Sequence, residues 1–77
     1  MYPEGCLLAP DGKKFFSFEK DPLNPPNEGF IELWSVLSDR SKTFIYRKRL
    51  AKYKALFQWN RLISQGWKEF QGYELVA

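Results

Sequence analysis

Basic and aromatic side chains are interleaved through residues 40–61. This stretch holds eight Lys or Arg residues and five Phe, Tyr or Trp residues, but no Asp or Glu. Cationic side chains steer anionic partners toward a surface, whereas aromatic rings anchor protein partners or stack on nucleobases. The chemistry that these residue types favour is therefore recognition of an anionic surface.

Charge is divided unevenly along the chain. Residues 1–39 have a balance of −4 and residues 40–77 a balance of +7, within a net charge of +3 for 77 residues. This split predicts docking onto an acidic partner, or a homodimer in which the basic half of one chain meets the acidic half of its mate. The arginines can equally pair inside the fold with acids such as Glu28 and Glu32.

Residue types that usually perform catalysis are scarce. The chain has no His and only one Cys, Cys6, and its five Gly are scattered as turn residues rather than gathered in a phosphate-binding loop. Acidic pairs such as Glu28 and Glu32 lie in a chain with little depth in which to shift a carboxyl pKa. We therefore expect a non-enzymatic protein without a cofactor, a metal or a disulfide.

Two features bear on the cellular location. A lone Cys fits a reducing compartment. No run of about 18 apolar residues is present, and the N-terminus lacks the pattern of a signal peptide. These features predict a cytoplasmic protein that does not span a membrane.

The first half of the chain reads as strands and turns. Residues 6–20 predict a β-hairpin closed by Pro10-Asp11-Gly12, with Phe16 and Phe18 on one face of its second strand. Residues 21–29 contain three Pro and predict an extended connector. Residues 30–37 are apolar on both faces, as expected for a central strand.

The second half predicts a strand, a helix and a closing strand. In the strand at residues 42–49, Phe44 and Tyr46 are expected on one face, with Phe44 in the core, and Arg47 and Arg49 on the other. A helix over about 51–65 follows, with an apolar stripe of Ala51, Ala55, Leu56, Trp59, Leu62 and Ile63. Gly66 should end the helix and Trp67 fold back onto the core, before a final strand at residues 67–76 with a bulge or turn at Gly72.

These elements add up to a single α+β domain over residues 1–77. We expect a small antiparallel β-meander of four to five strands with one amphipathic helix, at about 51–65, packed on it. The stability of so short a chain would rest on its aromatic content or on association with another chain.

The outer face of the helix is the candidate docking surface. Tyr53, Phe57 and Arg61 follow one another at four-residue steps and so lie on one side of it. An acidic protein surface is the expected partner, with aromatic anchors and steering cations. The candidate residues are Tyr53, Lys54, Phe57, Arg61, Arg47, Lys48 and Arg49. An equally weighted interpretation is that the Pro-rich connector at residues 22–29, or the last strand, folds over this face.

Nucleic acid is the alternative partner for the same residues. Arg47, Lys48 and Arg49 would neutralise phosphates, and Tyr46 or Tyr53 would stack on bases. The small net charge and the lack of an RNP-like, helix-turn-helix or zinc-finger motif weaken this hypothesis.

The helix and the residues after it resemble a small cyanobacterial family that is catalogued as a domain of unknown function. The family's pattern is Ala-Leu-x-x-Trp-x-x-Leu followed by Gly-Trp, and the matching positions here are Ala55, Leu56, Trp59, Leu62, Gly66 and Trp67. The chain departs from the family at Cys6, where a Trp is common, and at Lys54, where an acid is usual. The resemblance implies a cyanobacterial or cyanophage origin and a cytoplasmic protein, and it implies no activity.

Overall fold

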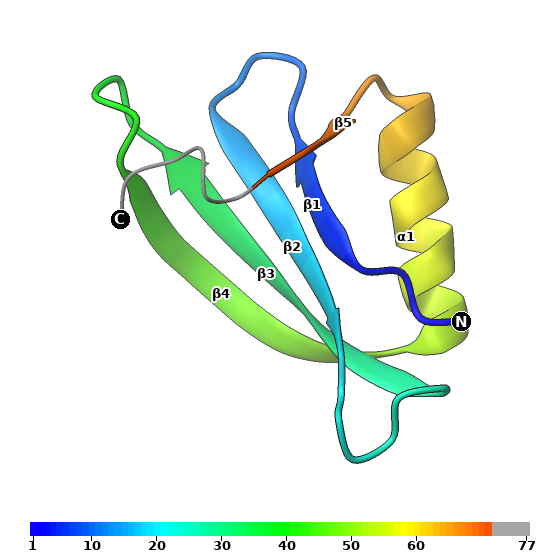
Figure 1. Cartoon of the computed structure of the whole chain (residues 1–77). Helices are drawn as coiled ribbons and strands as arrows, with labels where there is room; N and C mark the ends of the chain where they lie inside the picture. The colour runs from blue at the N-terminus through cyan, green and yellow to red at the C-terminus, as the bar shows by residue number, and fades with distance from the viewer. Residues whose placement is uncertain (72–77) are drawn as a thin grey trace.

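A five-stranded antiparallel sheet with one helix on one face makes up the part of the chain that the structure describes, residues 1–71 of a computed structural model (Figure 1). The elements are β1 (Gly5–Leu8), β2 (Lys14–Lys20), β3 (Glu28–Val36), β4 (Lys42–Ala51), α1 (Lys52–Ser64) and β5 (Lys68–Phe70). The strands lie in the order β4-β3-β2-β1-β5, and each neighbouring pair is antiparallel. The predicted α+β meander with one packed helix is confirmed.

The two turns of the N-terminal half differ in how well the sequence predicted them. The hairpin of β1 and β2 is as expected, and Gly12 takes the left-handed φ of 71° that its turn requires. The connector after β2 is not extended. It folds into compact turns in which the Glu28 amide donates to the Asn24 carbonyl oxygen (3.0 Å), and Glu28 and Gly29 already belong to β3.

A β-bulge changes which residues of β4 face the helix. Leu33 pairs with Tyr46, but its neighbour Trp34 pairs with Phe44, so Ile45 is an extra residue in β4. One inserted residue reverses the alternation of side chains. Phe44 and Tyr46 therefore lie on opposite faces, and Phe44 is 49% exposed. The predictions that these two rings share a face and that Phe44 is in the core were wrong.

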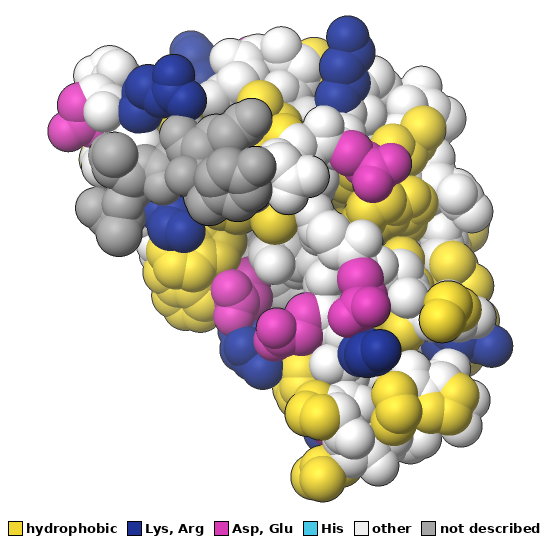
Figure 2. All heavy atoms as spheres, viewed as in Figure 1, with side chains coloured by type: hydrophobic (Ala, Val, Ile, Leu, Met, Phe, Trp, Pro, Cys, Tyr) yellow, Lys and Arg dark blue, Asp and Glu magenta, His cyan; other side chains and the backbone are white. Residues whose placement is uncertain are grey.

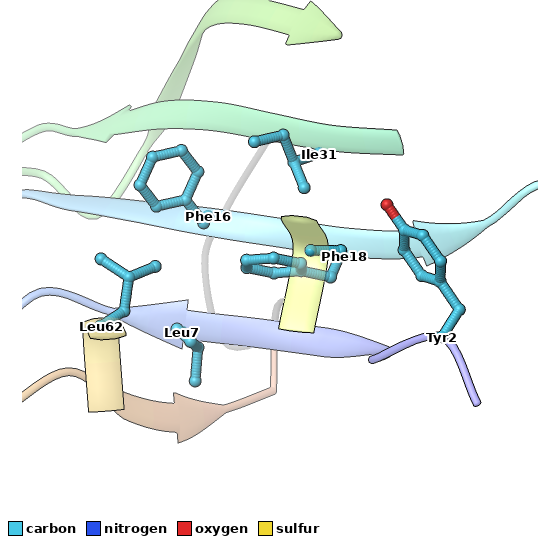
Figure 3. Close-up of a cluster of buried hydrophobic side chains, with 7 residues drawn as sticks. Tyr2, Leu7, Phe16, Phe18, Ile31 and Leu62 are labelled. Carbon is cyan, nitrogen blue, oxygen red and sulfur yellow. The ribbon is translucent and has the colours of Figure 1, made fainter. Parts of the chain in front are cut away.

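The hydrophobic core lies between α1 and the sheet (Figure 3). Phe16 and Phe18 of β2 share one face, as predicted, and that face is buried there together with Leu7, Ile31, Ala55 and Leu62. Trp59 packs at the margin with its ring edge-on to Phe18, 5.1 Å between centroids. Ile63, which was predicted to lie in the apolar stripe of the helix, is 42% exposed.

Both ends of the helix lie close to their predicted positions. Ala51 is extended (φ −65°, ψ 151°) and is the last residue of β4, so the helix begins at Lys52. Gly66 takes a positive φ of 95°, and Trp67 then packs on Phe16 with ring centroids 5.5 Å apart. The closing strand is shorter than predicted where it is described, and the predicted bulge or turn at Gly72 lies outside the described residues.

The N-terminus is tied to the junction of β4 and α1. Tyr2 is only 3% exposed, and its hydroxyl donates to the Leu50 carbonyl oxygen at 2.9 Å. Its ring occupies the space where a Cβ on Gly29 would be. Burial, and secondarily the charge of Glu28, raises the pKa of the Tyr2 hydroxyl. The neutral hydroxyl of Tyr2 therefore links the N-terminus to Leu50 by a hydrogen bond.

Candidate docking groove

An open groove lies where α1 leaves part of the sheet uncovered. In Figure 1, α1 runs beside β1, while β3 and β4 diverge from it. The groove has a volume of about 520 Å³. Its lining residues are Ile31, Lys48 and Leu50 from the sheet and Tyr53, Lys54, Phe57 and Gln58 from the helix. Two elements that are consecutive in the chain thus provide most of its wall.

The aromatic side chains of the groove are open to solvent. Tyr53 is 70% exposed and Phe57 69% exposed. The Pro-rich connector therefore does not cover the outer face of the helix, and the interpretation that it does was wrong. Two large rings side by side on a helix surface form more than an isolated exposed apolar residue.

The charge of the groove is positive. Lys48 and Lys54 line it, and no Asp or Glu is among its described lining residues. The Lys48 ammonium lies 5.6 Å from the ring centroid of Tyr46, a cation–π arrangement. Among residues 1–71, neither lysine forms an ion pair with an acid. The apolar rings and these two charges are thus available together.

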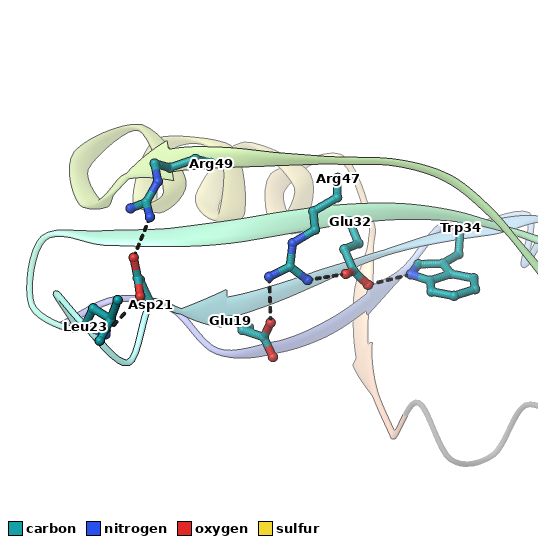
Figure 4. A network of polar contacts seen from close by, with 7 residues as sticks. All are labelled: Glu19, Asp21, Leu23, Glu32, Trp34, Arg47 and Arg49. Carbon is teal, nitrogen blue, oxygen red and sulfur yellow. Dashed lines mark hydrogen bonds and ion pairs between the residues drawn. The ribbon is translucent and has the colours of Figure 1, made fainter.

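Arg47 and Arg49 lie on the other face of the sheet. The Arg47 guanidinium contacts Glu32 at 2.7 Å and Glu19 at 3.5 Å (Figure 4). Its central carbon also lies 4.1 Å from the ring centroid of Phe30. Arg49 contacts Asp21 at 2.6 Å. On the face seen in Figure 2, acidic and basic side chains accordingly lie next to one another.

Asp21 is the most buried member of this ionic network, at 5% exposure. Its carboxylate accepts the Leu23 amide at 2.9 Å and the Arg49 guanidinium at 2.6 Å. These two hydrogen bonds hold the pKa of Asp21 below its usual range. The hydrogen bond to Asp21 in turn raises the pKa of Arg49. The network therefore joins β4 to the loop after β2.

The predicted docking residues are thus divided among three places. Tyr53, Phe57, Lys54 and Lys48 come together in the groove. Arg47 and Arg49 are occupied with acids of the N-terminal half, as the sequence allowed for Glu28 and Glu32. Arg61 is exposed in the last turn of α1, where a cation interacts favourably with the helix dipole, and it does not line the groove.

Sequence reasoning missed the floor of the groove. Ile31 lies in a predicted strand and Leu50 between the predicted strand at 42–49 and the helix, but nothing in their local pattern shows that the helix leaves them accessible from one side. Gln58 was not singled out at all. The one usable signal was the four-residue spacing of Tyr53 and Phe57, which places two large rings where a helix usually carries polar residues.

Within residues 1–71, no three His, Cys, Asp or Glu side chains gather into a group that could hold a metal ion. No helix in the same part of the chain has the length and apolar character needed to cross a membrane.

The fold and the groove define a small α+β protein whose sheet is only partly covered by its helix. The chain belongs to the family described as "Protein of unknown function (DUF1651)", whose model matches residues 4–72. No curated protein and no solved structure matches it.

Proposed function

We propose that this chain is a small, non-enzymatic interaction protein that docks onto an acidic protein partner through the groove between α1 and β4. The observation that carries the proposal is the combination of two exposed rings, Tyr53 and Phe57, with two cations, Lys48 and Lys54, around an apolar floor. Arg61 lies at the far end of the same helix and extends the positive charge. The side chains of Arg47 and Arg49 are left out of the contact surface because acids already hold their guanidinium groups.

Each kind of side chain has a separate part in this proposal. Burial of an aromatic anchor supplies affinity, and truncating such an anchor typically costs about 2 kcal/mol or more, or about thirtyfold in Kd. The lysines steer the encounter, so their effect falls mainly on the association rate and weakens with salt. An acidic partner with an apolar centre satisfies both requirements.

Location and origin belong to the same proposal. The lone Cys6 and the resemblance of the helix to a cyanobacterial family support a cytoplasmic protein of cyanobacterial or cyanophage origin. Fractionation of the cells that encode the chain, followed by immunodetection, tests the location. Recovery in a membrane or exported fraction would contradict it.

Affinity capture with matched variants tests the docking surface. The bait is the wild-type protein, the Tyr53→Ala/Phe57→Ala variant, or Leu23→Ala, which removes an apolar side chain that is 91% exposed and does not line the groove. We expect acidic proteins to be retained by wild type and Leu23→Ala but not by the double variant. Equal retention by all three baits would overturn the proposal.

A purified captured partner then allows a kinetic test. The Lys48→Glu/Lys54→Glu variant should bind with a slower association rate at low salt, and the difference should shrink as salt is raised. Association rates that are unchanged at low salt would argue against docking through this groove.

The alternative function is nucleic-acid binding by the same residues. The feature that favours it is the proximity of two lysines to Tyr53 and Phe57. The lysines would neutralise phosphates, and the two rings would stack on bases. Fluorescence titration with single- and double-stranded oligonucleotides at two salt concentrations separates the alternatives. Tight binding with a steep salt dependence would favour nucleic acid, whereas no binding would remove it.

A homodimer is the third hypothesis. The opposite net charges of residues 1–39 and 40–77 suggest it. However, Glu19, Asp21 and Glu32 already form ion pairs with arginines of the same chain. Light scattering across a range of salt tests it, and a strict monomer would exclude it.

A further inference from the structure

The strand β4 is a long free edge of the sheet. It occupies one end of the strand order, and among the described residues only β3 pairs with it. It is 10 residues long, and residues 43–49 are all exposed. Unpaired N–H and C=O groups along such an edge are a template for another strand, and proteins usually shorten or cover their edge strands.

The hydrogen-bonding phase shows which peptide groups point outward. The Asp21 amide donates to the Glu28 carbonyl oxygen at 2.9 Å, so Glu28 directs its backbone groups to β2 and away from β4. Hydrogen-bonded and non-bonded pairs alternate in an antiparallel ladder. Since Glu28 pairs with Ala51, the residues two and four positions earlier, Arg49 and Arg47, also direct their N–H and C=O groups to the free edge.

The side chains of β4 favour an acidic guest over a second copy of this chain. The strand carries Lys42, Arg47, Lys48 and Arg49 and no acid. Pairing two β4 strands would bring like charges into neighbouring cross-strand positions, which is destabilising. The arginines already contact acids on the outer face, whereas Lys48 on the helix side has no acid partner in the described chain.

The groove continues this edge on the helix side. Residues at alternate positions of a strand share a face, so Tyr46, Lys48 and Leu50 lie on the helix side, and Lys48 and Leu50 also line the groove. A guest strand beside β4 places its own alternate side chains opposite these three. Its complementary sequence is therefore apolar, acidic and apolar at every second position.

We propose, resting on the proposed docking function, that the acidic partner binds by adding an extended segment to the free edge of β4 as a sixth strand. The backbone groups of Arg47 and Arg49 hydrogen-bond to this segment. Its acidic side chain lies opposite Lys48 and within reach of the positive groove, and its apolar side chains contact Tyr46 and Leu50.

A peptide probe and two matched variants test strand addition. The probe is fluorescein-labelled Thr-Val-Thr-Glu-Thr-Val-Thr, and its binding is followed by fluorescence anisotropy. Arg47→Pro removes the outward N–H at an edge position, where proline is tolerated, and Arg47→Ala removes the same charge but keeps that N–H. We expect Arg47→Pro to bind about tenfold more weakly than Arg47→Ala, the loss of roughly one hydrogen bond. Equal affinities would overturn the proposal.

A second measurement leaves the protein unchanged, in case Arg47→Pro does not fold. The probe is N-methylated at every second amide, which keeps its side chains and charge but removes donors that a new strand needs. Wild-type protein should bind the parent peptide and lose the methylated one. Equal binding of both, or no binding of the parent at about 1 mM, would refute strand addition.

The outcomes separate this inference from the proposed function. If both peptides bind equally and Lys54→Glu weakens both, groove docking stands and strand addition fails. An oligonucleotide that displaces the probe from wild type, and binds Arg47→Pro and Arg47→Ala alike, would also overturn strand addition. A dimer seen by light scattering with Arg47→Ala but not with Arg47→Pro would assign the edge to a second copy instead.

Discussion

Replacing Tyr2 with Phe isolates one hydrogen bond beneath the groove. The hydroxyl of this buried residue donates to the Leu50 carbonyl oxygen at 2.9 Å, and Leu50 lines the groove. Tyr2→Phe keeps the ring and its packing but removes one of the donors to that partly buried carbonyl, which still faces the Gly29 amide of β3. The variant therefore tests whether the N-terminus stabilises the β4–α1 junction by this contact.

The expected cost can be compared with the stability of the whole chain. Losing one hydrogen bond to a carbonyl that keeps a second donor costs about 0.5–1.5 kcal/mol. A chain of 77 residues has a free energy of unfolding of about 4–12 kcal/mol. With a urea m-value of about 1 kcal/mol per molar for so small a protein, the unfolding midpoint should fall by about 0.5–1.5 M.

Urea unfolding followed by Trp fluorescence measures this shift. Tyr53→Phe is the matched control, because it removes a hydroxyl from a side chain that is 70% exposed and should leave the midpoint within error. The raised pKa of Tyr2 adds a pH signature: its stabilising effect is present below the unfolded pKa near 10 and is lost as pH rises through the folded pKa. Tyr2→Phe should lack that alkaline loss. A midpoint equal to that of wild type would refute the reasoning.

Three further predictions concern the network, the sheet and the groove. Because the pKa of Asp21 is lowered, its carboxylate stabilises the fold above the unfolded pKa of about 4, and this stabilisation is lost as pH falls through the folded pKa. Asp21→Asn should therefore flatten the acid side of a stability–pH curve measured by urea unfolding, and curves parallel to wild type would contradict this. Gly29→Ala should lower the free energy of unfolding by about 2 kcal/mol or more, because the new Cβ overlaps the Tyr2 ring and a β2 carbonyl; an unchanged thermal midpoint would show that the ring moves freely aside. Lys48→Glu/Lys54→Glu should change the urea-derived stability by no more than about 0.5 kcal/mol, since neither lysine pairs with an acid in the described chain, and a larger loss would reveal a structural role.

Local sequence patterns predicted most of the fold. Alternating apolar residues around Pro10-Asp11-Gly12 placed the first hairpin, and the helical period with Gly66 placed α1 within one residue at each end. These features depend on interactions between residues near one another in the chain, so they can be read from spacing. The Pro-rich loop was predicted less well because its shape depends on side-chain and backbone hydrogen bonds such as that from Leu23 to Asp21.

The sequence by itself determined the elements, the polarity of their faces and the cationic, aromatic character of residues 40–61. Only the tertiary structure decided which of those cations are available. The bulge at Ile45 reversed the faces of β4, because an extra residue changes the phase of every side chain beyond it. Arg47 pairs with Glu32 of β3 and Arg49 with Asp21 of the loop after β2, while the course of α1 leaves Lys48 and Lys54 beside an uncovered apolar floor. Those contacts join residues far apart in the chain, and spacing alone does not encode them.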